Sequence, residues 1–422
     1  MTSSGERLQR LVGLPAVTGE PQEVTSGIWM VPGFGNATLV LTDDGAAVVD
    51  PALLQNGPRV LRELRQRSQA PLRFVIYTHG HADHAFGTGP LLEDAAQRGD
   101  SPPQIVGHER VLDRLARYQR LHGQHDHINR IQFAVPPDRE AFPSVYYPPT
   151  LTYHHRLSLR LGDLTLECRH GIGETDDATW VWVPERRTVI AGDFVLWSCP
   201  NVGNPFKVQR YTLEWAEALE QMAALEPEHV VPGHGALLNR QGAQELLLGT
   251  ARALRYLEDE VVRRLNAGQW HEQILEEVDL PADLKEKPYL APIYGCPRFV
   301  VHGILRRYSG WFDGNPGNLF PSTRAEIGED VIAVAGGAGP LLERARALKA
   351  AGGPRNVQRA LHLVDFVLFG EGEDGPSARE AHALKADLLQ ARADAEPSFI
   401  ARNIFRHGAS REQEAANESS ES

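Results

Sequence analysis

Short apolar runs that end at a glycine, an imidazole or a carboxylate recur through the first 240 residues. The runs Leu72–Tyr77, Thr188–Gly192 and His229–Pro232 are bounded by such residues, whereas the stretch from Leu159 to Cys168 alternates apolar and polar positions. Continuous apolar runs of this length predict strands covered on both faces, and alternation predicts a strand with one face buried. The N-terminal part of the chain is therefore expected to form sheets with polar residues at the strand ends.

Beyond His234 the spacing of apolar residues changes to every third and fourth position, which is typical of helices. No new cluster of metal-binding residue types appears there, so we expect a helical interaction domain in place of a second catalytic one. The predicted helices lie at Leu246–Leu265, Pro297–Tyr308, Asn356–Phe369 and Ala378–Ala395. We place a catalytic domain at residues 1–245, a helical domain at 246–409 and a disordered Ser- and Glu-rich tail at 410–422.

The densest chemical signal follows the first of these strands, in the run Thr78-His79-Gly80-His81-Ala82-Asp83-His84. Three imidazoles and a carboxylate on one turn can point toward a common centre, and this donor set suits zinc and similar divalent ions. Ordinary polar loops rarely need four such residues together. The run therefore predicts a metal site.

Two ions can share this loop if His79 and His81 bind one and Asp83 and His84 bind the other. Each ion then needs further ligands from downstream strand ends. The candidates are His170 or Glu174 in the turn after Cys168, Asp193 after the run at 188–192, and His234 after the run at 229–232.

The order of these motifs resembles the metallo-β-lactamase superfamily, and the resemblance extends from about residue 24 to residue 240, including a hairpin-like segment that ends at Asp50. It implies an α/β protein with a four-layer αββα sandwich. It also implies that His79 and His81 hold the first metal, that Asp83, His84 and His234 hold the second, and that Asp193 bridges them.

The third ligand of the first metal departs from the family pattern. The usual turn His-Thr-Pro-Gly-His-Thr, laid on residues 170–175, places its ligand histidine at Glu174 and its other histidine at His170. We therefore expect Glu174 to be the ligand, with His170 as the alternative. A glutamate here means that Glu174, Asp83 and Asp193 together offset three of the four positive charges of two divalent ions.

A narrower resemblance lies in the C-terminal half. The segment Arg307–Leu319, with its Gly-Trp-Phe-Asp-Gly-Asn-Pro core, and the run Ala401–Phe405 resemble the dimerisation domain of metallo-β-lactamase-type alkylsulfatases, which also use a glutamate at the position of Glu174. This resemblance implies a homodimer. Two departures are the aspartate at 193, where those enzymes carry a bridging glutamate, and the expected lack of room for their sterol-carrier-like domain.

The implied chemistry is metal-assisted hydrolysis with two divalent ions, zinc favoured, that share a hydroxide. Asp83 and Asp193 are the expected catalytic carboxylates. By position relative to the alkylsulfatases, Asn201, Lys207 and Arg210 are candidates for binding an anionic ester, with a sulfate ester as the first hypothesis. A lactonase or thioesterase acting on a carboxylic ester is the alternative, and an iron-dependent oxygenase a third.

Composition limits the partners and the location. The chain has 422 residues, enough for two domains, and a net charge of −12 without a basic block, which argues against nucleic acid as a substrate. The first residues, Met1–Arg7, lack a signal-peptide pattern, and no window is apolar enough for a membrane span, so a cytoplasmic protein is expected. In the long excursion at 102–149, His125 and His127 are candidates for substrate contact or for solvated loop positions.

Overall fold

The computed structural model describes residues 19–418, and these form two compact units. The first unit comprises the chain up to Asp126 together with residues 142–311. The second comprises His127–Ala141 and the chain from Phe312 onward. The N-terminal residues that support the expectation of a cytoplasmic protein lie outside the described part. No helix within residues 19–418 is both long and apolar enough to cross a membrane.

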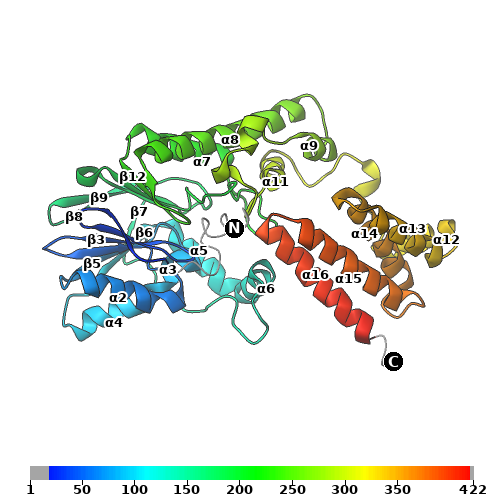
Figure 1. Ribbon diagram of the computed structural model, residues 1–422, viewed down its shortest axis with the longest axis horizontal. Helices are drawn as coiled ribbons and strands as arrows, with labels where there is room; N and C mark the ends of the chain where they lie inside the picture. Colours follow the sequence, from blue (N-terminus) through cyan, green and yellow to red (C-terminus); the bar gives the residue numbers. More distant parts are fainter. Residues whose placement is uncertain (1–18, 419–422) are drawn as a thin grey trace, which may run out of the picture. The chain divides into compact units, whose positions relative to one another are not determined.

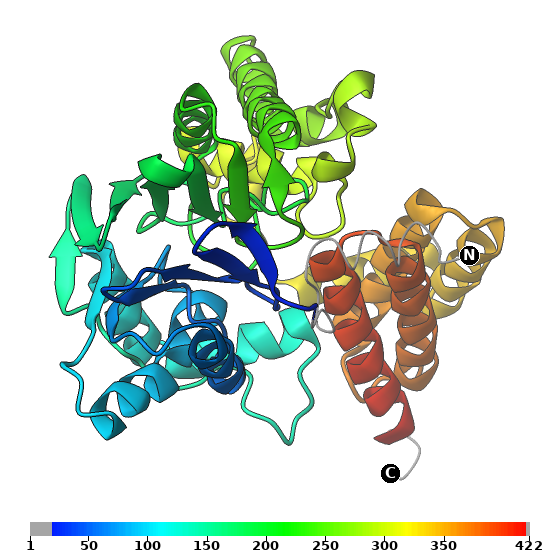
Figure 2. The same cartoon turned by 60° about the vertical axis from the view of Figure 1, so that its left-hand side comes forward.

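Two mixed sheets form the centre of the first unit (Figures 1 and 2). The first sheet has the order β1-β2-β3-β4-β5-β6-β7, and its last three pairings are parallel. Its strands are β1 (Gln22–Thr25), β2 (Ile28–Val31), β3 (Ala37–Leu41), β4 (Ala46–Val49), β5 (Leu72–Ile76), β6 (Gln104–His108) and β7 (Leu151–Tyr153).

The second sheet has the order β13-β12-β11-β10-β9-β8, with β11 and β12 parallel and the other pairs antiparallel. Its strands are β8 (Arg156–Leu161), β9 (Leu164–His170), β10 (Thr179–Val183), β11 (Thr188–Gly192), β12 (His229–Pro232) and β13 (Leu238–Asn239).

The apolar strands bury both of their faces in different cores. On β10, Trp180 and Trp182 pack toward the helices, whereas Val181 and Val183 point into the core between the sheets. Strand β4 alternates in the same way between the core between the sheets and an outer helical core. Because side chains alternate along a strand, a continuous apolar run here marks two covered faces.

Helices cover the outer face of each sheet, so the layers follow the predicted αββα order (Figure 1). Against the first sheet pack α2 (Gly57–Arg67), α4 (Gly89–Gln97) and α5 (Arg110–Arg120). Against the second pack α7 (Thr212–Ala224), α8 (Arg240–Asn266) and α11 (Pro297–Tyr308). The same unit also contains α3 (Ala82–Ala85), α9 (His271–Glu277) and α10 (Ala282–Lys285).

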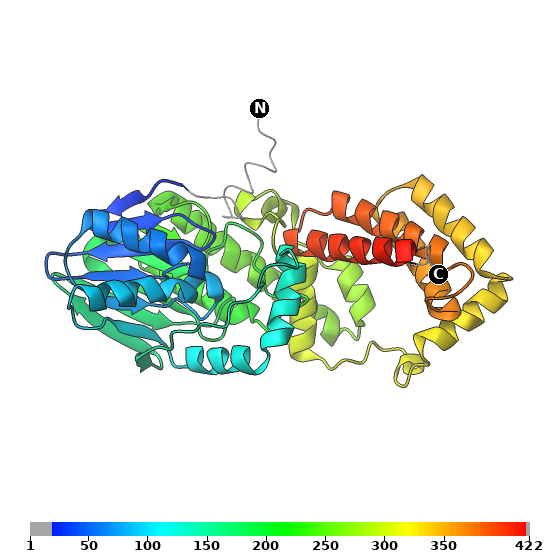
Figure 3. The same ribbon diagram turned by 90° about the horizontal axis from the view of Figure 1, so that it is seen from below.

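The second unit is helical, and α15 and α16 run along each other in it (Figure 3). Its helices are α12 (Arg324–Ala335), α13 (Ala338–Ala351), α14 (Pro354–Glu371), α15 (Ala378–Ala395) and α16 (Phe399–Glu418), together with the second half of α6 (His122–Phe133). Leu342, Val364 and Leu388 belong to its core. The predicted fold class, a metallo-β-lactamase-like sandwich followed by a helical domain, is confirmed.

The structure differs from two expected boundaries. The division predicted after residue 245 falls within α8, which belongs to the first unit because Leu246 and Leu254 are buried with Trp215 of α7 in one core. Residues 410–418, predicted as part of a disordered tail, form the last turns of α16, where Ala416 is buried. Residues 419–422 lie outside the described part.

Candidate metal centre

The histidine-rich run leaves the end of β5 and continues into the short helix α3. Strand β5 lies between its parallel neighbours β4 and β6, and polar groups gather where the carboxyl ends of parallel strands meet. From the second sheet, Glu174, Asp193 and His234 follow the ends of β9, β11 and β12. The two sheets therefore bring the predicted ligands toward one place from four separate segments.

The first group of donors consists of His79, His81, Glu174 and Asp193, whose ligand atoms lie within 4.8 Å of one another. Nε2 of His79 faces Nδ1 of His81 at 2.8 Å and Oδ2 of Asp193 at 3.5 Å. Nδ1 of His81 lies 3.7 Å from Oε2 of Glu174. This group contains all the ligands predicted for the first metal.

The second group consists of Asp83, His84 and His234. Oδ2 of Asp83 lies 3.5 Å from Nε2 of His84 and 3.4 Å from Nε2 of His234. Oδ1 of Asp193 lies 3.1 Å and 3.3 Å from the same two ring nitrogens. Asp193 therefore offers one carboxylate oxygen to each group, which is the arrangement that a bridging ligand requires.

The spacing of these donors fits divalent metal ions. Bonds of about 2.0–2.2 Å in tetrahedral geometry place neighbouring donors about 3.3–3.6 Å apart. The separations given above are 3.1–3.7 Å, except for 2.8 Å between the ring nitrogens of His79 and His81. The buried atoms Nε2 of His84 and Oδ1 of Asp193 lie 3.1 Å apart, but neither makes a contact with hydrogen-bond geometry to any residue that the structure describes. Buried polar atoms without partners are costly, and a shared cation would satisfy both.

Asp50 orients one donor of each group, directly or through Thr78. Its Oδ2 accepts hydrogen bonds from Nδ1 of His84 (2.8 Å) and from the hydroxyl of Thr78 (2.6 Å), and Oγ1 of Thr78 lies 3.1 Å from Nδ1 of His79. A carboxylate behind a ligating imidazole fixes its tautomer and strengthens it as a ligand. The sequence indicated Asp50 only as the end of a hairpin, because its partners are distant in the chain.

Electrostatics around the second group favour positive charge. Burial alone would lower the pKa of His84, but Asp193, Asp83 and Asp50 outweigh it and raise this pKa well above its ordinary value. At His79 burial prevails, lowering its pKa to about 4. Without a bound cation, the neighbouring carboxylates thus favour the protonated form of His84.

The structure distinguishes between Glu174 and His170. Only Glu174 lies with the first group, whereas the ring of His170 stacks on that of His108 at 3.7 Å and its Nδ1 donates to the carbonyl of Ala178 (2.9 Å). Glycine at 171 and 173 lets the turn pass closely over Phe194, because a Cβ at Gly173 would lie 2.5 Å from that ring. The turn thereby directs Glu174 to the centre and His170 away from it.

Replacing Glu174 with alanine is expected to cost most of the metal at the first position, because a direct ligand is lost. His170→Ala is the matched control in the same turn and should keep its metal, with a change in activity of about tenfold or less, since it acts only through the turn. Elemental analysis and turnover of both variants test this assignment. Full metal in Glu174→Ala together with metal loss in His170→Ala would reverse it.

Two of the predicted substrate-binding residues contact Glu174. Arg210, which is buried, pairs with Oε1 of Glu174 and also donates to the carbonyl of Asn201 at 2.7 Å. The side-chain amide of Asn201 donates to the same Oε1 at 2.7 Å. Burial raises the pKa of Glu174 to about 7, although Arg210 and Asn201 favour its ionised form. In this structure both residues therefore hold the carboxylate of Glu174.

Lys207, the third predicted residue, is half-buried beside the centre. Burial and the nearby Arg210 lower its pKa to about 8, against the opposing influence of Glu174 and Asp83. His125 lies close enough to Lys207 to interact with its charge. The ring of His125 packs edge-on against that of Tyr118, with 4.7 Å between the ring centroids. His127 belongs to the second unit, so only His125 of the two candidate histidines lies with the centre's own unit.

Two further features were not predicted from the sequence. Arg114 of α5 donates to Oδ2 of Asp177 at 2.7 Å, and the same oxygen accepts the backbone N–H of Gly80 at 3.0 Å, between two ligands. Tyr294 is half-buried near the centre: burial, together with the charges of Glu174 and Asp83, raises its pKa well above the ordinary value. Both arise from contacts between distant segments, for which the local pattern contains no signal.

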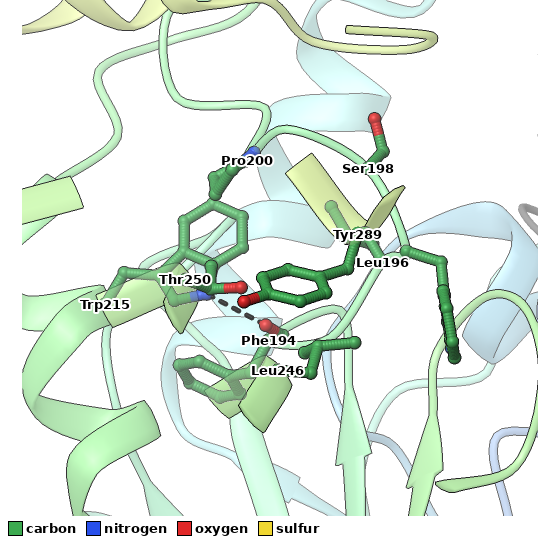
Figure 4. Close-up of a pocket in the computed structure, with 9 residues that line it drawn as sticks. Phe194, Leu196, Ser198, Pro200, Trp215, Leu246, Thr250 and Tyr289 are labelled. Atoms are coloured by element: carbon green, nitrogen blue, oxygen red, sulfur yellow. Dashed lines mark hydrogen bonds between the residues drawn. The ribbon is translucent and has the colours of Figure 1, made fainter. Parts of the chain in front are cut away.

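A small pocket lies behind the segment that follows Asp193 (Figure 4). Nε1 of Trp215 donates to the carbonyl of Phe194 at 3.1 Å across its wall. The lining residues are Phe194, Leu196, Trp197, Ser198, Pro200, Trp215, Leu246, Thr250 and Tyr289. None of these is a candidate ligand, and most belong to the core between the sheet and α7 and α8, so this space is separate from the donor groups.

Comparison with known proteins gives two family matches. Residues 30–234 match the metallo-beta-lactamase superfamily, and residues 271–415 match the family described as alkyl sulfatase dimerisation. A linear primary-alkylsulfatase from Pseudomonas sp. (strain ATCC 19151) is 28% identical over 322 residues, which cover 71% of this chain and 59% of that protein. An (R)-specific secondary-alkylsulfatase from Pseudomonas sp. is 24% identical over 421 residues, 92% of this chain and 61% of that protein.

The fold has a counterpart among solved structures. The stereoselective inverting sec-alkylsulfatase Pisa1 from Pseudomonas sp. superposes with a TM-score of 0.83 at 21% identity, over 97% of this chain and 67% of that one. The chain spans about three fifths of the length of the curated relatives that it matches.

Proposed function

Because the chain combines a metallo-beta-lactamase domain with an alkyl sulfatase dimerisation domain, we propose that it is a dinuclear metal-dependent hydrolase of sulfate esters. The observation that carries the proposal is the pair of donor groups joined by Asp193, each oxygen of which faces a different group. The names of the curated relatives, all alkylsulfatases, support the sulfate ester as the substrate.

The proposed ligands are His79, His81 and Glu174 for one ion, Asp83, His84 and His234 for the other, and Asp193 for both. These residues would hold two divalent ions, zinc being favoured by imidazole and carboxylate donors, and the bound ions would supply Lewis acidity and activate water for hydrolysis near neutral pH. Asp193 faces donors of both groups, and Asp83 faces His84 and His234 of the second group. Asp50 fixes the orientation of His84 and, through Thr78, of His79.

Charge at the centre favours an anionic substrate. Counted alone, Asp83, Asp193 and Glu174 offset three of the four positive charges of two divalent ions. Arg210 pairs with Glu174, however, and so returns one positive charge to the immediate surroundings. Lys207 adds a second cation, close enough to interact with Glu174 and Asp83. A monoanion such as a sulfate monoester is attracted by this balance, whereas a neutral lactone gains little from it.

The substrate assignment is tested by a panel of alkyl sulfate, phosphate monoester, lactone and thioester substrates with the metal-loaded protein. We expect alkyl sulfates of short or medium chain to turn over best. Lys207→Met should then raise KM for the sulfate by about tenfold to a hundredfold, the equivalent of one hydrogen bond to a charged group, without loss of metal. Lactone hydrolysis should change little.

Arg306→Met is the matched control for Lys207, because this exposed arginine contacts the Lys207 backbone carbonyl at 3.2 Å. It should behave like the unmodified protein. Arg210→Met should lower metal content as well as activity, since Arg210 holds a proposed ligand. Efficient turnover of lactones or thioesters without turnover of sulfate esters would overturn the substrate assignment.

We also propose that the chain forms a homodimer through its helical half. The match to the dimerisation family covers residues 271–415. Large apolar side chains are exposed in and just after the segment that resembles that family: Trp311 is 77% exposed and Phe320 90% exposed. Large aromatic side chains that are exposed on a single subunit are typical of surfaces that become buried at the centre of an interface.

A further inference from the structure

A second concentration of histidines lies at the ends of β6, β7 and β9, outside the proposed dinuclear centre. His108 ends β6, Glu109 follows it, and His154 follows β7. Strands β6 and β7 are parallel neighbours in register, with His108 opposite Tyr153, and Glu109 donates its backbone N–H to the carbonyl of Tyr153 at 3.1 Å. The residues just beyond the two strands are therefore adjacent in space.

The ring of His108 is fixed in one orientation and one tautomer. It is 1% exposed and stacks on the ring of His170 at 3.7 Å with an angle of 12°. Nε2 lies 2.8 Å from the carbonyl of His154, so this nitrogen carries the proton. Nδ1 carries the lone pair and accepts a long hydrogen bond of 3.3 Å from the backbone N–H of Arg110, which a bound ion would replace. A histidine whose other N–H donates to a carbonyl is the arrangement found at metal ligands.

His154 and Glu109 complete a set of three donors. Nδ1 of His154 lies 2.5 Å from Oε1 of Glu109, and the donor atoms of all three residues lie within 4.8 Å of one another. An ion bound by all three would bring these atoms about 3.3–3.6 Å apart. The side chains of His154 and Glu109 are 63% and 49% exposed, so both can rotate into place around the fixed His108.

We propose that His108, Glu109 and His154 bind one divalent transition-metal ion, zinc or copper(II), independently of the dinuclear centre. Two imidazoles and one carboxylate are the donor types that these ions prefer, and hard ions such as magnesium favour oxygen donors. Three protein ligands leave further coordination positions to water.

Such an ion would join the turn between β7 and β8 to the start of α5. Helix α5 begins at Arg110, directly after Glu109, and one turn later carries Arg114, which holds Asp177. The ion would therefore stabilise the N-terminal end of α5, whose Arg114 supports the histidine-rich loop through Asp177. It is structural in kind and contributes no group to the proposed reaction.

The test is zinc binding by the untagged, metal-loaded protein in equilibrium dialysis across the micromolar range, with metal measured by elemental analysis. Compared with His154→Ala and Glu109→Gln, the unmodified protein should hold one more zinc per chain, and each variant should bind that ion at least about tenfold more weakly. The comparison depends only on the difference between variants, so it does not depend on how many ions the dinuclear centre holds.

His155→Ala is the matched control, because this exposed neighbour has its ring 4.2 Å from that of His154 and lies outside the donor set. It should retain the additional zinc. Equal zinc in the unmodified protein and His154→Ala would overturn the proposal. A loss in His155→Ala as large as in His154→Ala would also overturn it, by indicating non-specific binding to exposed histidines.

Discussion

Replacing Asp193 with alanine is expected to lower turnover by roughly a thousandfold and to remove bound metal from both positions. Its two oxygens lie 3.5 Å from Nε2 of His79 and 3.1 Å from Nε2 of His84, so one substitution takes a donor from each group. Metal ions contribute several kcal/mol to catalysis of this kind, and about 1.4 kcal/mol corresponds to a factor of ten in rate. Elemental analysis and initial rates with the best alkyl sulfate measure the two effects.

Asp193→Asn separates the bridging role from simple loss of packing. The amide keeps the shape of the side chain but offers one oxygen and no charge, so it can serve one donor group and not both. We expect it to retain more metal than Asp193→Ala while remaining nearly as inactive. Asp163→Asn, at an aspartate whose side chain is 69% exposed, controls for the loss of a carboxylate and should have no effect. Two ions per chain and near-normal rates in Asp193→Ala would exclude a bridging role.

The sequence predicted those parts of the centre that depend on local order. The histidine-rich loop places four donors within six residues, and Asp193 and His234 each follow an apolar run, so strand ends alone indicated where they would meet. Both groups of donors contain only residues that the sequence had suggested. The αββα layers were implied by the family resemblance, and the runs buried on both faces agree with it.

The supporting contacts could not be predicted, because they join segments that are distant in the chain. Arg210 was assigned to the substrate by its position relative to the alkylsulfatases, yet it contacts Glu174, 36 residues earlier. The pairing of Arg114 with Asp177 spans 63 residues. Spacing along the chain reveals residues that share a turn or a face, but long-range partners depend on how the layers pack.

Replacing Arg114 with methionine is expected to destabilise the protein by about 3–5 kcal/mol and to weaken metal binding. Arg114 is 4% exposed and Asp177 is fully buried, so the substitution leaves a buried carboxylate without its cation. Burial favours the neutral acid, and it is Arg114 that keeps the pKa of Asp177 below its ordinary value. The same carboxylate accepts the N–H of Gly80, which lies between His79 and His81. Losing Arg114 should therefore also displace these two proposed ligands. Urea unfolding and metal content measure both effects.

Arg110→Met is the matched control on the same helix. Arg110 approaches Asp176 at 3.8 Å with both side chains more than 40% exposed, and exposed pairs of this kind contribute about 0–1 kcal/mol. If the free energies of unfolding of Arg114→Met and Arg110→Met differ by no more than about 1 kcal/mol, the buried pair is not needed for stability.

The double variant Arg114→Met with Asp177→Asn distinguishes a charge effect from a loss of packing. If the cost of Arg114→Met comes from the unpaired carboxylate, removing that charge should restore much of the stability, because neutral groups of similar shape can replace a buried ion pair at little cost. The amide oxygen of the introduced asparagine can still accept the N–H of Gly80, so metal binding should recover together with stability. If the loss of unfolding free energy in the double variant instead equals the sum of the losses in the two single variants, Arg114 contributes through its packing. Its charge then does not position the proposed metal ligands.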